Sequence, residues 1–142
     1  MTDLKDRLND KSLLRTDSYV NGAWTSGEDA FEVTNPADRS VLAKVADVGE
    51  AGARKAVDAA DQAFAKWGKT SVYERARLIS KWNDLILEHA DDLGTLITAE
   101  MGKPFGEAKG EVIYGAGFVS WSAEEAKRLH GETLQTPFPG SR

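Results

Sequence analysis

The sequence has 142 residues, 41% hydrophobic and 29% charged, which is ordinary for a soluble globular protein with one domain. Its net charge of −5 argues against nucleic acid or an anionic membrane as a partner, and no apolar run approaches the roughly 20 residues that cross a bilayer. The absence of cysteine excludes disulfides, cysteine-bound zinc and a thiol nucleophile within these residues, and fits a cytoplasmic protein.

The first part of the chain has the pattern of short β-strands. β-Branched and aromatic residues are enriched there, and Asn21-Gly22 is a strong signal for a tight turn. Pro36 begins a second predicted turn that ends at Arg39, because proline presets the backbone for such turns. The sequence therefore predicts an antiparallel hairpin or meander, with strands in segments 18–24, 30–36 and 40–48.

The pattern becomes helical after Val48. Apolar residues then recur at spacings of three and four, which predicts a helix with one buried face. Gly68 is expected to end this helix. Ser71 and Glu74 form a capping box for the next one, in which each side chain accepts a hydrogen bond from the other residue's amide. The buried face of the first helix is expected to contain Ala53, Ala56, Val57, Ala60, Phe64 and Trp67.

Three more helices are predicted in the rest of the chain. Gly102 is a natural end for the third helix, and Pro104 suits the start of a fourth that extends to about His130. The fold class is therefore α/β, with a β-hairpin or meander followed by four helices. The expected buried residues are Leu78, Ile79, Trp82, Leu85 and Ile86 in the second helix, and Leu93, Leu96 and Ile97 in the third.

The triplet Gly68-Lys69-Thr70 matches the end of a phosphate-binding loop. Such a loop needs a glycine five residues before its Gly-Lys pair and a strand leading into it. Ala63 occupies that position and lies within a predicted helix. We interpret the triplet as a connection between two helices.

The fourth helix is apolar almost all round over residues 111–121, so it is expected to be buried on several sides. Gly115 and Gly117 weaken a helix, and a close neighbouring element is their expected compensation. One stripe contains Val112, Ala116, Val119, Ala123 and Ala126. A second contains Tyr114, Phe118, Trp121 and Glu125, and is typical either of core packing or of the wall of a ligand channel.

Other candidate motifs have simpler interpretations. The GAGFVS stretch falls in mid-helix, whereas a dinucleotide fingerprint requires a strand-to-helix turn. His89 and His130 have no partner at ligand spacing and are expected at helix ends. The acidic pairs Asp91-Asp92 and Glu124-Glu125 are expected on solvated faces, because adjacent helical residues diverge in direction.

Five segments resemble the N-terminal part of the aldehyde dehydrogenase superfamily: VNGAW, VTNPA, ERARLISKW, EMGKPFGEAKGEV and FVSWSAEEAKRLHGE. The nearest resemblance is to its succinate-semialdehyde dehydrogenase branch, from about Tyr19 to Thr136. It implies an N-terminal extension over residues 1–18. Residues 19–142 would then be the N-terminal portion of an aldehyde dehydrogenase domain, truncated before the catalytic half and belonging to the cofactor-binding domain.

The resemblance also implies a chemistry for the complete enzyme. In this family a cysteine thiolate attacks the aldehyde, hydride passes to NAD or NADP, and a glutamate activates water to release the acid. The matching segments contain neither these groups nor the cofactor-binding glycine turn. No catalytic, cofactor-binding or metal-binding residue is therefore expected in this chain, and no cofactor is expected to bind it alone.

One element of the family's site does carry over. Phe118 and Trp121 resemble residues that line the family's aldehyde entrance tunnel, and Tyr114 lies one turn earlier on the same face. We therefore expect Tyr114, Phe118 and Trp121 to be substrate-channel residues, which shape and desolvate the approach to the thiol without taking part in bond changes.

The sequence-based hypothesis is an N-terminal fragment of a cytoplasmic, NAD(P)-dependent succinate-semialdehyde dehydrogenase. Its expected partners are a small aldehyde, the remainder of the fold and, in the complete enzyme, further copies of itself. The isolated chain is expected to be inactive. Two alternatives stay open: a complete small helical protein-interaction module, and a dehydrogenase of the same family that acts on another aldehyde.

Overall fold

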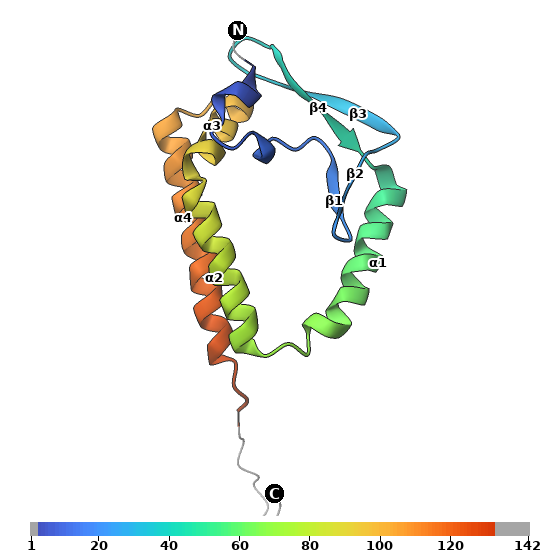
Figure 1. Ribbon diagram of the computed structural model, residues 1–142, viewed down its shortest axis with the longest axis vertical. Coiled ribbons are helices and arrows are strands. Elements are labelled where there is room, and N and C mark those ends of the chain that lie inside the picture. Colours follow the sequence, from blue (N-terminus) through green and yellow to red (C-terminus); the bar gives the residue numbers. More distant parts are fainter. Residues whose placement is uncertain (1–2, 133–142) are drawn as a thin grey trace, which may run out of the picture.

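The structure, a computed structural model, describes residues 3–132, so the last residues of the resemblance, 133–136, lie outside it. Figure 1 shows an open frame with α1 on one side, α2 and α4 side by side on the other, and strands β3 and β4 across one end. The elements, including the short 3₁₀ helices η1 to η3, are η1 Leu4–Arg7, η2 Lys11–Leu13, β1 Ser18–Val20, β2 Ala23–Thr25, β3 Asp29–Thr34, β4 Val41–Asp47, α1 Gly49–Trp67, α2 Val72–Glu88, α3 Ala90–Met101, α4 Phe105–Glu125 and η3 Ala126–Arg128. The mixed α/β class and the four helices confirm the sequence prediction.

The strands form two separate antiparallel hairpins rather than one continuous meander. The predicted turn at Asn21 and Gly22 is present, with φ values of 49° and 80°, and it divides the first predicted strand into β1 and β2. Tyr19 and Trp24 face each other across this hairpin, with ring centroids 5.2 Å apart in an edge-to-face arrangement.

The second hairpin pairs β3 with β4, from Asp29 opposite Asp47 to Thr34 opposite Val41. The predicted turn between them is confirmed. The Asn35 amide donates to the Ser40 carbonyl at 2.9 Å, and the Arg39 amide donates to the Asn35 carbonyl at 2.7 Å.

The expected buried face of α1 is not buried within the described residues. Val57 and Phe64 are 68% and 64% exposed, and no residue of α1 is classed as buried. The apolar stripe is present, but the element of residues 3–132 that packs beside α1 is the small β1–β2 hairpin. The apolar stripe of α1 therefore needs a cover that residues 3–132 do not provide.

The connection between α1 and α2 lies where the sequence predicts it, and its hydrogen bonds agree in part with the prediction. Gly68 ends α1, but with φ −61° and ψ −23° it keeps a right-handed conformation instead of the usual left-handed stop. The Ser71 hydroxyl accepts from the Glu74 amide at 3.2 Å, which confirms half of the capping box. The Glu74 carboxylate binds the Arg77 guanidinium instead of the Ser71 amide, because the arginine offers a charged partner one turn ahead.

The core lies where α4 packs against both α2 and α3. It is built from small side chains, which let the helices approach closely. Val119 and Ala126 of the predicted α4 stripe are only partly buried. The large apolar residues expected inside α2 lie further out, with Trp82 59% and Leu85 44% exposed. The buried members of the helical core are Ala76, Ala90, Ala99, Ala108, Val112, Ala116 and Ala123.

The charged pairs on the helices behave differently from one another. Asp92 is only 3% exposed, so the prediction of a solvated face is wrong for this residue, whose carboxylate is occupied by the N-terminal segment. Asp91 is exposed, as expected, and its carboxylate lies 2.7 Å from the Lys109 ammonium of α4. Glu124 and Glu125 form exposed ion pairs with the basic residues one turn later, as expected for solvated side chains.

The predicted end of α3 at Gly102 is confirmed, and it supports a prediction. Gly102 has φ +79°, its amide donates to the Thr98 carbonyl at 3.0 Å, and a Cβ there would lie 2.9 Å from Cγ of Pro36. Gly102→Ala should lower the free energy of unfolding by about 1 to 3 kcal/mol, because alanine is disfavoured at positive φ and meets the proline ring. Urea unfolding followed by circular dichroism measures the change. Gly106→Ala, where an added Cβ meets nothing within 4 Å, is the matched control and should not lower stability.

Candidate substrate-channel surface

The three predicted channel residues lie on the exposed face of α4, opposite the face that packs on α2 and α3. Tyr114, Phe118 and Trp121 are 70%, 57% and 65% exposed, whereas Ala116 and Ala123 on the opposite face are almost fully buried. The separation follows from the helical repeat, since residues at spacings of three, four and seven share a face. Within residues 3–132 the rings are therefore not core residues.

The structure brings two of these rings into direct contact. The centroids of Tyr114 and Phe118 are 4.9 Å apart with an interplanar angle of 88°, the edge-to-face arrangement that aromatic pairs favour. Trp121 follows one turn further along the same face. The three side chains form a continuous apolar strip, which we call the aromatic strip of α4.

The glycines beside the aromatic strip have no close neighbour in the described chain. A Cβ added at Gly115 or Gly117 would meet nothing within 4 Å. The expected compensation by a neighbouring element is therefore wrong for residues 3–132, because the elements that contact α4 lie on its alanine face. The strip and the adjacent glycines remain open.

The aromatic strip can bind and shape, but it holds no group that bonds to a substrate. Its polar groups are the Tyr114 hydroxyl and the Trp121 indole N–H, which can form hydrogen bonds. The nearby Glu125 and Glu111 carboxylates form ion pairs with Arg128 and Lys103, which fits a structural role. Flat, apolar walls of this kind exclude water from a passage and select its occupants by shape.

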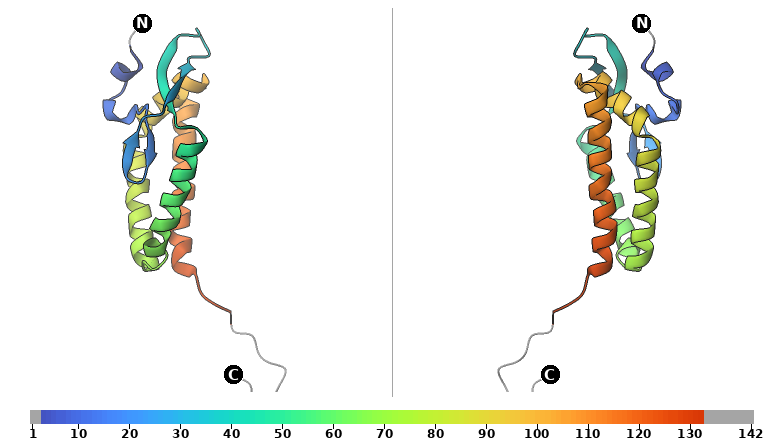
Figure 2. Two further views of the ribbon diagram at one scale, coloured as in Figure 1. Left: turned by 90° about the vertical axis from the view of Figure 1, so that its right-hand side faces the viewer. Right: turned by 90° about the vertical axis from the view of Figure 1, so that its left-hand side faces the viewer.

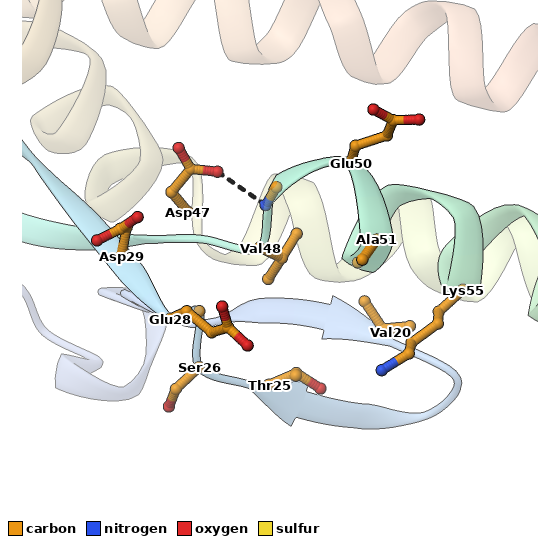
Figure 3. A pocket seen from close by; sticks show the side chains of 13 residues that line it. Val20, Thr25, Ser26, Glu28, Asp29, Asp47, Val48, Glu50, Ala51 and Lys55 are labelled. Atoms are coloured by element: carbon orange, nitrogen blue, oxygen red, sulfur yellow. Dashed lines mark hydrogen bonds between the residues drawn. The ribbon is translucent and has the colours of Figure 1, made fainter.

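A separate pocket lies on the other side of the frame, between the β1–β2 hairpin, the start of β3 and the start of α1. Its volume is about 500 Å³. Figure 3 shows the Lys55 side chain extending from α1 toward the hairpin, and the Asp47 carboxylate accepting from the Gly49 amide at 2.9 Å. Glu28, Asp29 and Glu50 add three more carboxylates, and the lining contains neither histidine nor cysteine. No sequence motif had indicated this pocket, because its residues come from four short, unrelated segments.

Metal and histidine chemistry find no support in the described part of the chain. No group of three or more His, Asp or Glu side chains within residues 3–132 is arranged to hold a metal ion. His89 lies at the junction of α2 and α3, the helix-end position expected from the sequence. Over the same range, no helix is long and apolar enough to span a membrane.

Most of the sequence matches a known family. Residues 24–142 match the aldehyde dehydrogenase family. The chain belongs to this family. The resemblance identified in the five sequence segments is thereby confirmed.

Curated relatives of this aldehyde dehydrogenase chain act on several different aldehydes by name. It is 47% identical over 126 residues to the mitochondrial succinate-semialdehyde dehydrogenase of Homo sapiens, covering 89% of this chain and 24% of the human protein. It is 41% identical over 138 residues to a glutarate-semialdehyde dehydrogenase of Pseudomonas putida. That match covers 96% of this chain and 29% of the Pseudomonas protein. It is 43% identical over 130 residues to the NADP⁺ succinate-semialdehyde dehydrogenase of Escherichia coli. That match covers 90% of this chain and 27% of the E. coli protein.

Solved structures agree with this assignment. An aldehyde dehydrogenase from Brucella melitensis superposes with a TM-score of 0.92 at 44% identity, covering 94% of this chain and 28% of that one. The indole-3-acetaldehyde dehydrogenase AldA of P. syringae, solved with NAD⁺, superposes with a TM-score of 0.83 at 30% identity, covering 87% and 26%. The chain thus spans about a quarter of the length of the proteins it matches.

Proposed function

We propose that this chain is the N-terminal part of an NAD(P)-dependent dehydrogenase that oxidises succinate semialdehyde to succinate. The observation that carries the proposal is the 47% identity to human succinate-semialdehyde dehydrogenase across 89% of the chain. The nicotinamide cofactor is supported by relatives named for NADP⁺ or solved with NAD⁺, and the choice between the two stays open. Residues 19–142 would form the start of the aldehyde dehydrogenase domain and residues 1–18 an extension before it.

The proposed contribution of this chain to the reaction is a wall of the aldehyde channel. The aromatic strip of Tyr114, Phe118 and Trp121 is exposed, apolar and free of reactive groups, which suits a surface that guides a small molecule. In the complete enzyme these rings would exclude water along the approach to the nucleophile. Their large area fixes the shape of the passage and hence which aldehydes enter.

The nucleophile and the cofactor site are proposed to lie in other parts of the polypeptide. None of the 142 residues is cysteine, so the family's thiolate cannot come from this chain. Exposed large apolar residues on three helices, among them Phe64, Trp82 and Trp121, support the rest of the fold as the partner of this unit. Alone, the chain is expected to be poorly soluble and inactive.

A second substrate has a specific observation in its favour. The Pseudomonas putida glutarate-semialdehyde dehydrogenase is 41% identical across 96% of this chain. Glutarate semialdehyde is one methylene longer than succinate semialdehyde and carries the same terminal carboxylate. The residues that would hold that carboxylate are not assigned in this chain, so both semialdehydes belong in the assay.

The test compares the complete enzyme with the isolated chain. The coding sequence is read past Arg142, the whole protein is purified, and formation of NADH or NADPH is followed with each semialdehyde. We expect turnover by the complete enzyme, with the higher kcat/KM for succinate semialdehyde, and none by residues 1–142. A stop codon directly after Arg142 in intact flanking DNA would instead support a small interaction module. Turnover by the isolated chain, free of contaminating enzyme, would contradict the proposal.

We also propose a cytoplasmic location and a homo-oligomeric complete enzyme. The cysteine-free composition supports a reducing compartment, although the human relative is named as mitochondrial. Cell fractionation with an antibody against the complete protein tests the location. Size-exclusion chromatography with light scattering tests the oligomeric state.

A further inference from the structure

The N-terminal segment, residues 3–14, is attached to the start of α3 through one buried carboxylate. Oδ1 of Asp92 accepts from the Asn9 amide at 2.8 Å and from the Asn9 side-chain Nδ2 at 3.1 Å. Oδ2 of Asp92 accepts from the Asp10 amide at 2.9 Å. The donors lie more than 80 residues before the acceptor in the sequence, so these bonds fix a long-range contact. Hydrogen bonds to a charged acceptor are stronger than those between neutral groups.

Apolar packing accompanies this contact. Leu4 and Leu8 are 4% and 5% exposed, the largest of the buried apolar side chains in the described chain. Helix η1 contacts α3, and Figures 1 and 2 show the N-terminal segment lying beside the α3 end of the helical unit. The segment is therefore packed against the helices, although it belongs to neither β-hairpin.

Among the carboxylates near the N-terminal segment, that of Asp92 holds the segment, because the others have different partners. Burial raises the pKa of Asp92, but the hydrogen bonds from Asp10 and Asn9 and the charge of His89 outweigh it and hold the pKa below its ordinary value. The Asp10 carboxylate is occupied by the Ser12 amide, and Asp91 is paired with Lys109 of α4. Neither neighbouring acid therefore substitutes for Asp92.

We propose that Asp92 is a positioning residue that holds residues 3–14 on α3, and that loss of its charge releases this segment while α2, α3 and α4 stay folded. The protonated or amidated side chain keeps one acceptor oxygen but loses the negative charge and the second acceptor. The packing of the two buried leucines and one weaker acceptor then remain to hold the segment. Release therefore exposes Leu4 and Leu8 and frees the Asn9 and Asp10 amides.

The pH dependence has a definite sign. A carboxyl group whose pKa is lowered in the folded state stabilises the attached segment above its unfolded pKa of about 3.9. This stabilisation is lost as the pH falls through the folded pKa. The segment should therefore detach at acid pH and stay attached at neutral pH.

Hydrogen exchange of the complete protein tests the proposal. Two variants are compared, each of which lacks one negative charge. In Asp92→Asn at pH 7, the Asn9 and Asp10 amides should exchange at least about tenfold faster than in the wild type, since the lost bonds were charge-assisted. Amides in α4 should exchange at the wild-type rate. Asp91→Asn, which alters the adjacent exposed carboxylate, should leave Asn9 and Asp10 protected.

Two results would overturn the proposal. One is that the Asn9 and Asp10 amides exchange at the same rate in Asp92→Asn as in Asp91→Asn. The other is that α4 amides lose protection together with the segment in Asp92→Asn. An acid titration of the wild type by NMR gives a measurement that needs no substitution. The amide resonances of Asn9 and Asp10 should move together, with a midpoint below about 3.9, while the α4 amides keep their protection from hydrogen exchange. Amide resonances that do not respond to acid would also refute the role of Asp92.

Discussion

Gly27→Ala should prevent stable pairing of β3 with β4. A Cβ at residue 27 would lie 1.9 Å from the Asp47 carbonyl oxygen, 2.4 Å from its carbon and 2.8 Å from the Asp29 carbonyl oxygen. These are backbone atoms of the first residue pair in the hairpin, so they cannot move away as a flexible side chain would. We expect a loss of more than about 3 kcal/mol in the free energy of unfolding, above the usual cost of overpacking. The midpoint of thermal unfolding and the yield of soluble protein measure it.

The control for this prediction is another glycine-to-alanine change. A Cβ at Gly110, in the interior of α4, meets nothing within 4 Å. Gly110→Ala should therefore leave stability unchanged or raise it by up to about 1 kcal/mol, through the better helix propensity of alanine. An equal effect of both substitutions would show that the space around Gly27 is larger than the structure indicates.

Local features of the fold were predictable because neighbouring residues decide them. The turn at Asn21-Gly22, the cap at Ser71 and the end of α3 at Gly102 depend on backbone preferences over a few residues. Helical periodicity likewise identified Val112, Ala116 and Ala123 as one buried face. The sequence left open whether the strands form separate hairpins or one meander, since strand partners are chosen across the whole chain, and the structure has two separate hairpins.

Features that depend on distant residues escaped the sequence analysis. Nothing near Asp92 indicates that residues 9 and 10 will bind it, and an acidic pair on a helix is usually solvated. The pocket beside α1 gathers short segments without any motif. The same limitation explains the exposed face of α1. An apolar stripe predicts that a helix will be covered, but it does not say which element covers it.

The aromatic strip was predicted only because the family resemblance was added to the residue pattern. Periodicity placed Tyr114, Phe118 and Trp121 on one face, but by itself it favoured core packing over channel lining. Their exposure shows that they are not packed into the core of residues 3–132. Their role in the complete enzyme stays a prediction, and it is best tested by kinetics.

Trp121→Ala in the complete enzyme should raise the KM for succinate semialdehyde about tenfold, with a much smaller change in kcat. Removing the indole takes away a large apolar contact, worth about 1 to 1.5 kcal/mol in binding, and touches no group that bonds to the substrate. The wider passage should also reduce the preference for succinate semialdehyde over bulkier aldehydes. Steady-state kinetics with both kinds of aldehyde measure these changes. The KM of Trp121→Phe should stay close to the wild-type value.

The matched control is Trp82→Ala, which removes the same side chain from α2, where the indole is also mostly exposed in this chain. If Trp121 lines the channel, only its own substitution changes the KM and the aldehyde preference, whatever either substitution does to stability. If Trp121 instead packs against another part of the fold, Trp121→Ala will reduce the yield of soluble enzyme while the surviving protein keeps its wild-type KM. The ratio of KM change to stability change therefore distinguishes the two roles, because only channel lining couples the indole to the substrate.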